Sequence, residues 1–349
     1  MLDQHLDDLF QAAADRDPDR LFEHASRLYA ATEDADPATL SAVVVRLSGV
    51  FALVPSGIGA RLGIVAGALA EHGADPVPLA EPLVGQLTEL LEKSAGFAAA
   101  WREATGEEPP EPDDNDPGWL AATAARLTGP PEQEAMKLTD AWAHVYMAAM
   151  PVLSILQLSP RLRAELPGRD RLAAALSAVL EDREDLQWLA GLLSVLQDER
   201  LVVLHRETGR GYEVVIGGIG DNFQLHTLLA DVVSGPADHG LVEGVQPDPR
   251  WVLAASDGDV DPEDDDPVHG QFNLVDAHGK WIWNEGVPAD IPHLDGVRVV
   301  VLDPPPYARS WSPGRRFPMM PATIRLERIL PEDEAASWMA RIAPEGGAG

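Results

Sequence analysis

The hydrophobic pattern of the chain changes near Asp198, and this change divides the sequence into two structural classes. Before that point apolar residues recur at spacings of three and four, as Leu2, Leu6 and Leu9 do, which predicts amphipathic helices. After it, short β-branched runs alternate with glycines, which predicts strands. We therefore expect a two-part protein, in which residues 1–200 form a helical domain and residues 201–349 form a mixed α+β domain.

Three of the Asp-Pro dipeptides in the helical part stand directly before a helical pattern. They are Asp17-Pro18, Asp36-Pro37 and Asp75-Pro76. Asp accepts hydrogen bonds from the first free amides of a helix, and Pro fits the first helical position. Repeated starts of this kind suit a short α-solenoid, but no fixed period aligns them, so an all-helical bundle is favoured. The acidic, proline-rich residues 105–118 are expected to form a linker-like loop.

The second part reads as strands with few helices between them. Its first two strands are expected in "RLVVLHRETGRGYEVVIGG", around a turn at Thr208 and Gly209. Further strands are expected in "WVLAAS", "GQFNLVD", "KWIWNEG", "VRVVVLD" and "ATIRLERIL", and a closing helix in "PEDEAASWMARI". Only one helix lies clearly between strands, which argues against a doubly wound nucleotide-binding fold.

Acidic residues outnumber basic residues in both parts of the chain. Residues 1–200 contain 15 Lys and Arg against 33 Asp and Glu, and residues 201–349 contain 11 against 24. The formal net charge of −31 opposes binding to nucleic acid or to an anionic membrane, because both need clustered cations. The sequence has no cysteine, which excludes thiolate chemistry and disulfides and fits a cytoplasmic protein.

The segment "VVIGGIGDNFQLHTLLADVV" leads from a strand through glycines into a helix. Gly218 and Gly220 permit positive φ angles and close approach of a ligand. Free amides at the helix start could then hold an anion, with Asn222 and His226 one turn apart beside it. A capped helix after a tight turn is the favoured alternative, because the stretch Gly217–His226 lacks a phosphate-loop motif and contains an acidic residue.

The helix in this segment is expected to be amphipathic. Its expected buried stripe consists of Leu225, Leu228, Leu229 and Val232. Its expected solvated side carries Gln224, Thr227 and Asp231.

The stretch "DPPPYARSWSPGRRFPMMP" concentrates positive charge in an acidic chain. Arg309, Arg315 and Arg316 alternate with aromatic residues, among them Trp311. Arginine and aromatic side chains together favour recognition of an anionic or planar group, or of a partner protein. In the alternative interpretation these arginines pair with the protein's own acids.

Two patterns resemble metal sites without meeting their requirements. In "DGDVDPEDDD" the first three positions match a calcium loop, but Pro262 and Val268 occupy positions that need glycine and glutamate. His269, His278 and His293 lie in expected loops, but their spacing does not require a shared metal. We therefore expect neither a metal nor a cofactor.

Two functions remain open at this point. The favoured one is an intracellular binding protein, in which a helical scaffold carries an α+β module for an unknown protein or anionic small molecule. The alternative is a transferase or hydrolase acting on an anionic substrate, with the Gly217–His226 helix start and the Arg309–Arg316 loop as anion site. His226 would then be its acid or base. A pocket that joins His226 to the arginine loop would favour the enzyme.

Overall fold

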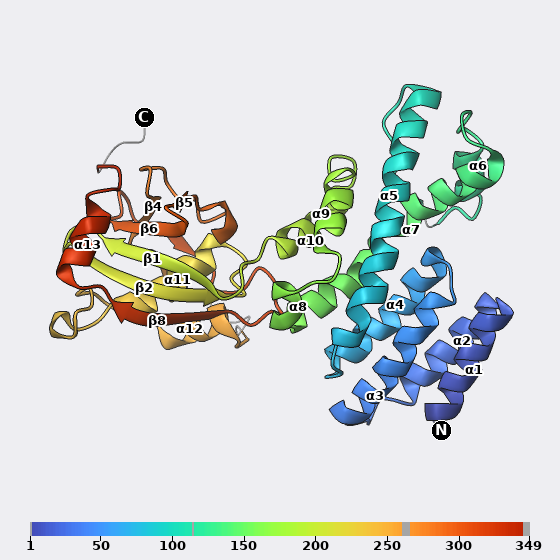
Figure 1. The fold of residues 1–349 in the computed structure, drawn as a ribbon, viewed down its shortest axis with the longest axis horizontal. Coiled ribbons are helices and arrows are strands. Elements are labelled where there is room, and N and C mark those ends of the chain that lie inside the picture. The colour runs from blue at the N-terminus through green and yellow to red at the C-terminus, as the bar shows by residue number, and fades with distance from the viewer. Residues whose placement is uncertain (1, 114, 260–265, 345–349) are drawn as a thin grey trace. The chain divides into compact units, whose positions relative to one another are not determined.

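The computed structural model describes residues 2–113, 115–259 and 266–344 (Figure 1). The chain forms two compact units, Met1–Leu193 and Ser194–Gly349. Helices build the first unit, and a mixed sheet with flanking helices builds the second. The predicted two-part fold class is confirmed.

The first unit is helical in its regular structure. Its α-helices are α1 (Leu2–Asp15), α2 (Pro18–Ala30), α3 (Pro37–Ser48), α4 (Ser56–Glu71), α5 (Ala80–Thr105), α6 (Trp119–Ala124), α7 (Glu132–Leu158), α8 (Pro160–Ala164), α9 (Arg169–Ser177) and α10 (Gln187–Leu193). Its 3₁₀ helices are η1 (Gly49–Ala52), η2 (Val77–Leu79) and η3 (Glu184–Leu186).

The Asp-Pro dipeptides mark helix starts as predicted. Asp17 and Asp36 cap α2 and α3, and each carboxylate accepts from the amide three residues later, at 3.1 and 2.9 Å. Asp75 accepts from the amide of Val77 at 3.0 Å and so begins the short η2 turn that leads into α5. Local capping chemistry therefore sets these boundaries.

The acidic, proline-rich stretch at residues 105–118 joins α5 to α6 within the first unit. The indole Nε1 of Trp142 donates to the carbonyl of Pro110 at 2.8 Å, which ties this stretch to α7. It is therefore a loop of the helical unit and does not connect the two units.

Helix α7 forms the centre of the first unit, since it packs against both α4 and α5. Glycines on α4 allow a close approach: a Cβ added at Gly67 would lie 3.2 Å from the Cα of Pro151 on α7. Ser154 on α7 also donates to Glu71 at 2.6 Å. Small residues on one helix thus admit the proline of the other.

Helix α7 is also long and apolar enough to span a membrane, judged by length and composition alone. Of its most apolar window, 61% is buried inside the protein. The core helix of a helical bundle has the same composition.

The second unit is built on a sheet. Its strands are β1 (Glu199–His205), β2 (Arg210–Gly217), β3 (Val268–His269), β4 (Asn273–Asp276), β5 (His293–Leu294), β6 (Val297–Asp303), β7 (Ser310–Trp311) and β8 (Thr323–Ile329). Its helices are α11 (Asn222–Val233), α12 (Pro249–Ser256), α13 (Glu332–Met339) and the 3₁₀ helices η4 (Ala237–His239) and η5 (Pro288–Asp290).

The main sheet has the strand order β4-β6-β1-β2-β8, with β5 also paired to β6. The β1–β6 pair is parallel and its other pairs are antiparallel. Leu201 and Val203 of β1 pack in one cluster with residues of α11 and α12, whereas Val202 and Leu204 pack in another with residues of α13. Both faces of β1 are buried, which is why its sequence is a continuous apolar run.

Two predicted strands are wrong. "WVLAAS" forms helix α12, because Asp248 caps it by accepting from the amide of Arg250 at 2.9 Å and a proline follows at the first helical position. It is a fourth Asp-Pro start. "KWIWNEG" makes only an isolated bridge from Trp281 to Val275 within the described residues, and then turns away from the sheet.

The close α4–α7 contact generates a prediction. Gly67→Leu should lower the melting temperature, because overpacking against the Pro151 backbone costs about 1–3 kcal/mol. The matched Gly85→Leu variant on α5 should be neutral or stabilising, by up to about 0.8 kcal/mol. Apart from the nearby backbone of α5 itself, no described atom lies within 4 Å of a Cβ added there, and leucine favours the helix. Thermal unfolding followed by far-UV circular dichroism measures both. Equal shifts in the two variants would contradict the packing described for α4.

Candidate functional site

The glycines before α11 are explained by the chain itself. Gly218 has a φ of +69°, and a Cβ added there would lie 2.1 Å from the carbonyl oxygen of Pro321. A Cβ added at Gly220 would lie 2.9 Å from the Cβ of Arg316 and 3.0 Å from the ring of Phe317. The space that glycine leaves open is thus occupied by residues 316–321.

Protein acceptors also occupy the amides at the start of α11. The amide of Asn222 donates to the carbonyls of Asn284 and Gly286, at 3.1 and 3.0 Å. The amide of Gln224 donates to the carboxylate of the cap residue Asp221 at 2.9 Å. These contacts match the favoured interpretation, a capped helix, and they leave the expected anion cradle without its donors.

Helix α11 is buried on more sides than its sequence predicts. Gln224 and Thr227, expected on a solvated side, are 1% and 3% exposed. The amide Nε2 of Gln224 donates to the carbonyl of Ala255 at 2.6 Å, and the hydroxyl of Thr227 accepts from the indole of Trp311 at 3.3 Å. The expectation fails for these two residues because α12 and the β7 segment cover them, whereas Asp231 stays partly exposed.

A cavity of about 390 Å³ lies beside this helix. It is lined by Phe223, Trp283, Asn284, Glu285, Tyr307, Ala308, Arg309, Ser310 and Trp311. Trp283 and Tyr307 are 59% and 52% exposed, and the Trp311 ring lies 5.6 Å from that of Phe223. Aromatic walls of this kind suit a flat apolar or planar group.

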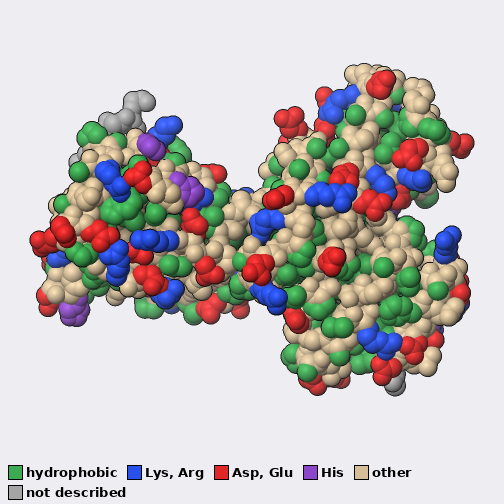
Figure 2. Space-filling model, in the orientation of Figure 1, with side chains coloured by type: hydrophobic (Ala, Val, Ile, Leu, Met, Phe, Trp, Pro, Cys, Tyr) green, Lys and Arg blue, Asp and Glu red, His purple; other side chains and the backbone are tan. Residues whose placement is uncertain are grey.

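Most arginines of this acidic protein have acidic partners. Figure 2 shows Asp and Glu side chains over the drawn face of both units, with Lys and Arg among them. Arg328, for example, pairs with Glu213 at 2.9 Å and with Glu334 at 2.7 Å. In such ion pairs the carboxylate neutralises the arginine, which is then not available to an anionic ligand.

Arg309 is different. Its Nη2 donates to the carbonyl of Phe272 at 3.0 Å and to the side-chain oxygen of Asn273 at 3.1 Å, both neutral groups. Its Nε is buried without a hydrogen-bond partner, and no carboxylate of the described residues lies within ion-pair distance. Arg309 therefore makes no ion pair with any described residue at the cavity wall, although the carboxylate of Glu285 also lines the cavity.

A further buried polar atom beside this cavity, Asn222 Oδ1, lacks a hydrogen-bond partner among the described residues. The buried side chains of His226 and Asn284 interact with each other instead, through a hydrogen bond that raises the pKa of His226. Asn284 lines the cavity, and the Nδ2 of Asn222 donates to the carbonyl of Trp283 at 2.8 Å. An unsatisfied buried polar atom costs about 1–3 kcal/mol, so Asn222 Oδ1 and Arg309 Nε are places where a ligand or water would complete the hydrogen bonding.

His226 lies behind Trp311, with 4.9 Å between the ring centres, and is 1% exposed. Its Nε2 accepts from the amide of Phe272 at 3.3 Å, which assigns the proton of the neutral ring to Nδ1. Burial, together with the charge of Arg309, lowers the pKa of His226 to about 4, against the opposing effect of a side-chain hydrogen bond with Asn284. The ring is therefore neutral near pH 7 and shielded from the cavity, which disfavours a role as acid or base.

The arginine loop divides at this site. Arg309 and Trp311 line the cavity together. Arg315 donates to the carbonyl of Ser256 at 3.1 Å, and Arg316 lies against the Gly220 turn, where its charge partly offsets the burial that raises the pKa of Asp221. That Arg315 and Arg316 contribute to binding a ligand or partner stays a prediction.

Neither metal pattern in the second half of the sequence forms a group of ligands in the described residues. Residues 260–265 of the acidic loop lie outside the described ranges, and Asp257, Asp259 and Asp266 beside them are exposed. Within the described ranges, His269, His278 and His293 are not brought into one metal-binding group. The expected loop positions are wrong for His269 and His293, which lie in the short strands β3 and β5 because each pairs with a neighbouring strand.

Trp283 and Asn284 are site residues that sequence reasoning missed. Both belong to "KWIWNEG", which was interpreted as a strand. The Asn-Glu-Gly sequence at its end is a turn signal, and it was the available indication that this segment leaves the sheet.

Comparison with protein families, with curated proteins and with solved structures finds no match to this chain.

The buried histidine predicts a pH dependence of stability. Because the pKa of His226 is about 4 in the folded chain and ordinarily 6.5, the unfolded chain binds more protons between these values. Stability should therefore fall by about 3 kcal/mol as the pH drops through this window. Urea unfolding of the native chain and of His226→Gln at several pH values isolates this contribution. Parallel stability curves for the two proteins would show that His226 titrates normally.

Proposed function

We propose that the second unit is a binding module for a planar group that carries a carboxylate or carbonyl oxygen, and that the helical unit is its scaffold. The observation that carries this proposal is the Arg309 guanidinium, which has an unpartnered Nε and no acidic partner among the described residues, within an aromatic cavity. A planar guanidinium matches a carboxylate in shape and charge, and aromatic rings stack on planar groups.

The exposed side chains of Trp283 and Tyr307 at the cavity support recognition of a small molecule, or of a partner side chain, with this chemistry. Trp, Tyr and Arg are the residue types that dominate binding energy at protein interfaces. The acidic charge of the chain supports neither nucleic acid nor an anionic membrane as the partner. We also propose a cytoplasmic location, which the absence of cysteine supports.

Binding is better supported than the enzymatic alternative, a transferase or hydrolase. That alternative needs an accessible acid or base and an open helix start. His226 is buried with a pKa of about 4, and the helix-start amides of Asn222 and Gln224 already have protein acceptors.

Three small probes test the proposed chemistry. Benzoate and benzamide present a planar oxygen acceptor, whereas benzylamine presents a cation. We expect benzoate to bind with a Kd in the millimolar range, benzamide more weakly, and benzylamine not at all. Saturation-transfer NMR and tryptophan fluorescence measure this binding, because Trp283 and Trp311 both line the cavity.

Two arginine variants localise the binding. Arg309→Lys should weaken benzoate at least about tenfold, because lysine lacks the planar fork. Arg325→Lys on β8, where the guanidinium pairs with Glu327 and does not line the cavity, is the matched control and should leave the affinity unchanged. The proposal fails if benzylamine binds as well as benzoate, or if Arg309→Lys binds benzoate like the native chain at an unchanged melting temperature.

A further inference from the structure

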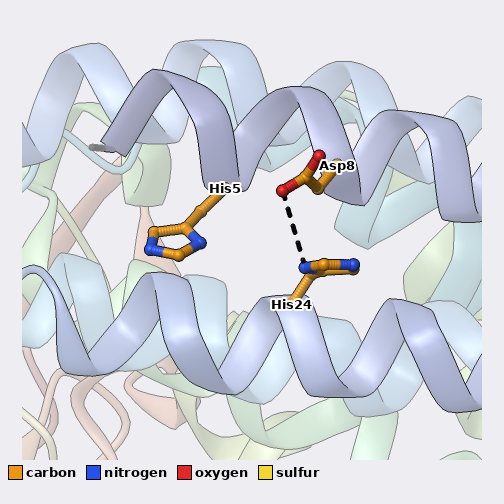
Figure 3. A group of neighbouring side chains, drawn as sticks. All are labelled: His5, Asp8 and His24. Carbon is orange, nitrogen blue, oxygen red and sulfur yellow. Dashed lines mark ion pairs between the residues drawn. The ribbon is translucent and has the colours of Figure 1, made fainter.

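Two histidines and an aspartate meet between the first two helices of the helical unit. His5 and Asp8 lie one turn apart on α1, and His24 faces them from α2 (Figure 3). One ligand atom from each residue lies within 4.8 Å of the other two. The Nδ1 of His24 is 4.0 Å from Oδ2 of Asp8.

Both imidazoles leave a buried nitrogen unsatisfied. The Nδ1 atoms of His5 and His24 have no hydrogen-bond partner among the described residues, and His24 is only 9% exposed. When both Nδ1 atoms are unprotonated, the two imidazoles and the carboxylate are all acceptors, and a single water molecule can donate to only two of them. One cation can be bound by all three at once.

The surroundings hold the carboxylate ready for a cation. The side-chain amide of Gln4 donates to Oδ1 of Asp8 at 2.9 Å, which orients the carboxylate and leaves Oδ2 for the group. Arg46, the nearby cation, pairs with Asp3 at 2.8 Å and Asp7 at 2.6 Å instead. In the described part of the chain, no Lys or Arg lies within ion-pair distance of Asp8.

We propose that His5, Asp8 and His24 bind one divalent cation of the zinc type and so link α1 to α2. Imidazole nitrogen and carboxylate oxygen are established zinc ligands, and three of them leave a fourth position for water. Ligand atoms on a tetrahedral cation with bonds of about 2.0–2.1 Å lie roughly 3.3 Å apart, so each atom must move by about 1 Å from its present place. Small rotations of the half-buried His5 and Asp8 side chains, and of the more enclosed His24 side chain, supply such a movement.

The experiment uses the full-length chain without a histidine tag, after treatment with a chelator. Calorimetric titration with ZnCl₂ should give one ion per chain, and Co²⁺ should produce the visible absorption of a four-coordinate ion. His5→Gln, Asp8→Asn and His24→Gln should each weaken Zn²⁺ binding at least about tenfold. His72→Gln on the end of α4 is the matched control and should leave the affinity unchanged.

Stability gives a second measurement. Zn²⁺ should raise the melting temperature of the native chain and of His72→Gln, but not of the three ligand variants, since binding to the folded state stabilises it. The proposal is overturned if the native chain shows no saturable Zn²⁺ binding, if Co²⁺ keeps the spectrum of the free ion, or if Asp8→Asn and His24→Gln bind Zn²⁺ like the native chain.

Discussion

The cavity of the second unit depends on how the start of α11 is capped. The Asn222 amide donates to the Asn284 and Gly286 carbonyls, and its side chain donates to the Trp283 carbonyl. These bonds fix a loop that is distant in sequence against the helix, and so place Trp283 and Asn284 in the cavity wall. The same bonds consume the helix-start amides, so the contact that builds the cavity also removes the anion site that glycine and helix together suggested.

Charge is informative here because the chain is so acidic. An arginine in such a protein normally finds a carboxylate, as Arg46 and Arg328 do, and an exposed pair of this kind contributes little to stability. Arg309 is oriented by neutral oxygens of Phe272 and Asn273 instead. Neutral acceptors fix the guanidinium without cancelling its charge, which keeps that charge for a ligand.

Histidine occupies opposite electrostatic settings in the two units. His226 is enclosed by the rings of Trp311 and Phe272 and feels the charge of Arg309, so a cation is disfavoured there. His24 lies beside Asp8, and a cation is favoured there. The neighbouring charge therefore decides which of these buried imidazoles suits a metal.

The sequence by itself determined the fold class, the helix starts at Asp17 and Asp36, and the strands β1, β2, β6 and β8, because periodicity and capping are local properties. It also indicated Arg309 and Trp311 through an unusual local composition. Tertiary structure decided which side of α11 is covered, since α12 and β7 bury residues that the helical period placed in solvent. The tertiary structure alone places Trp283 near Arg309 and His24 near Asp8. A contact between distant segments leaves no periodic signal in the sequence of either segment.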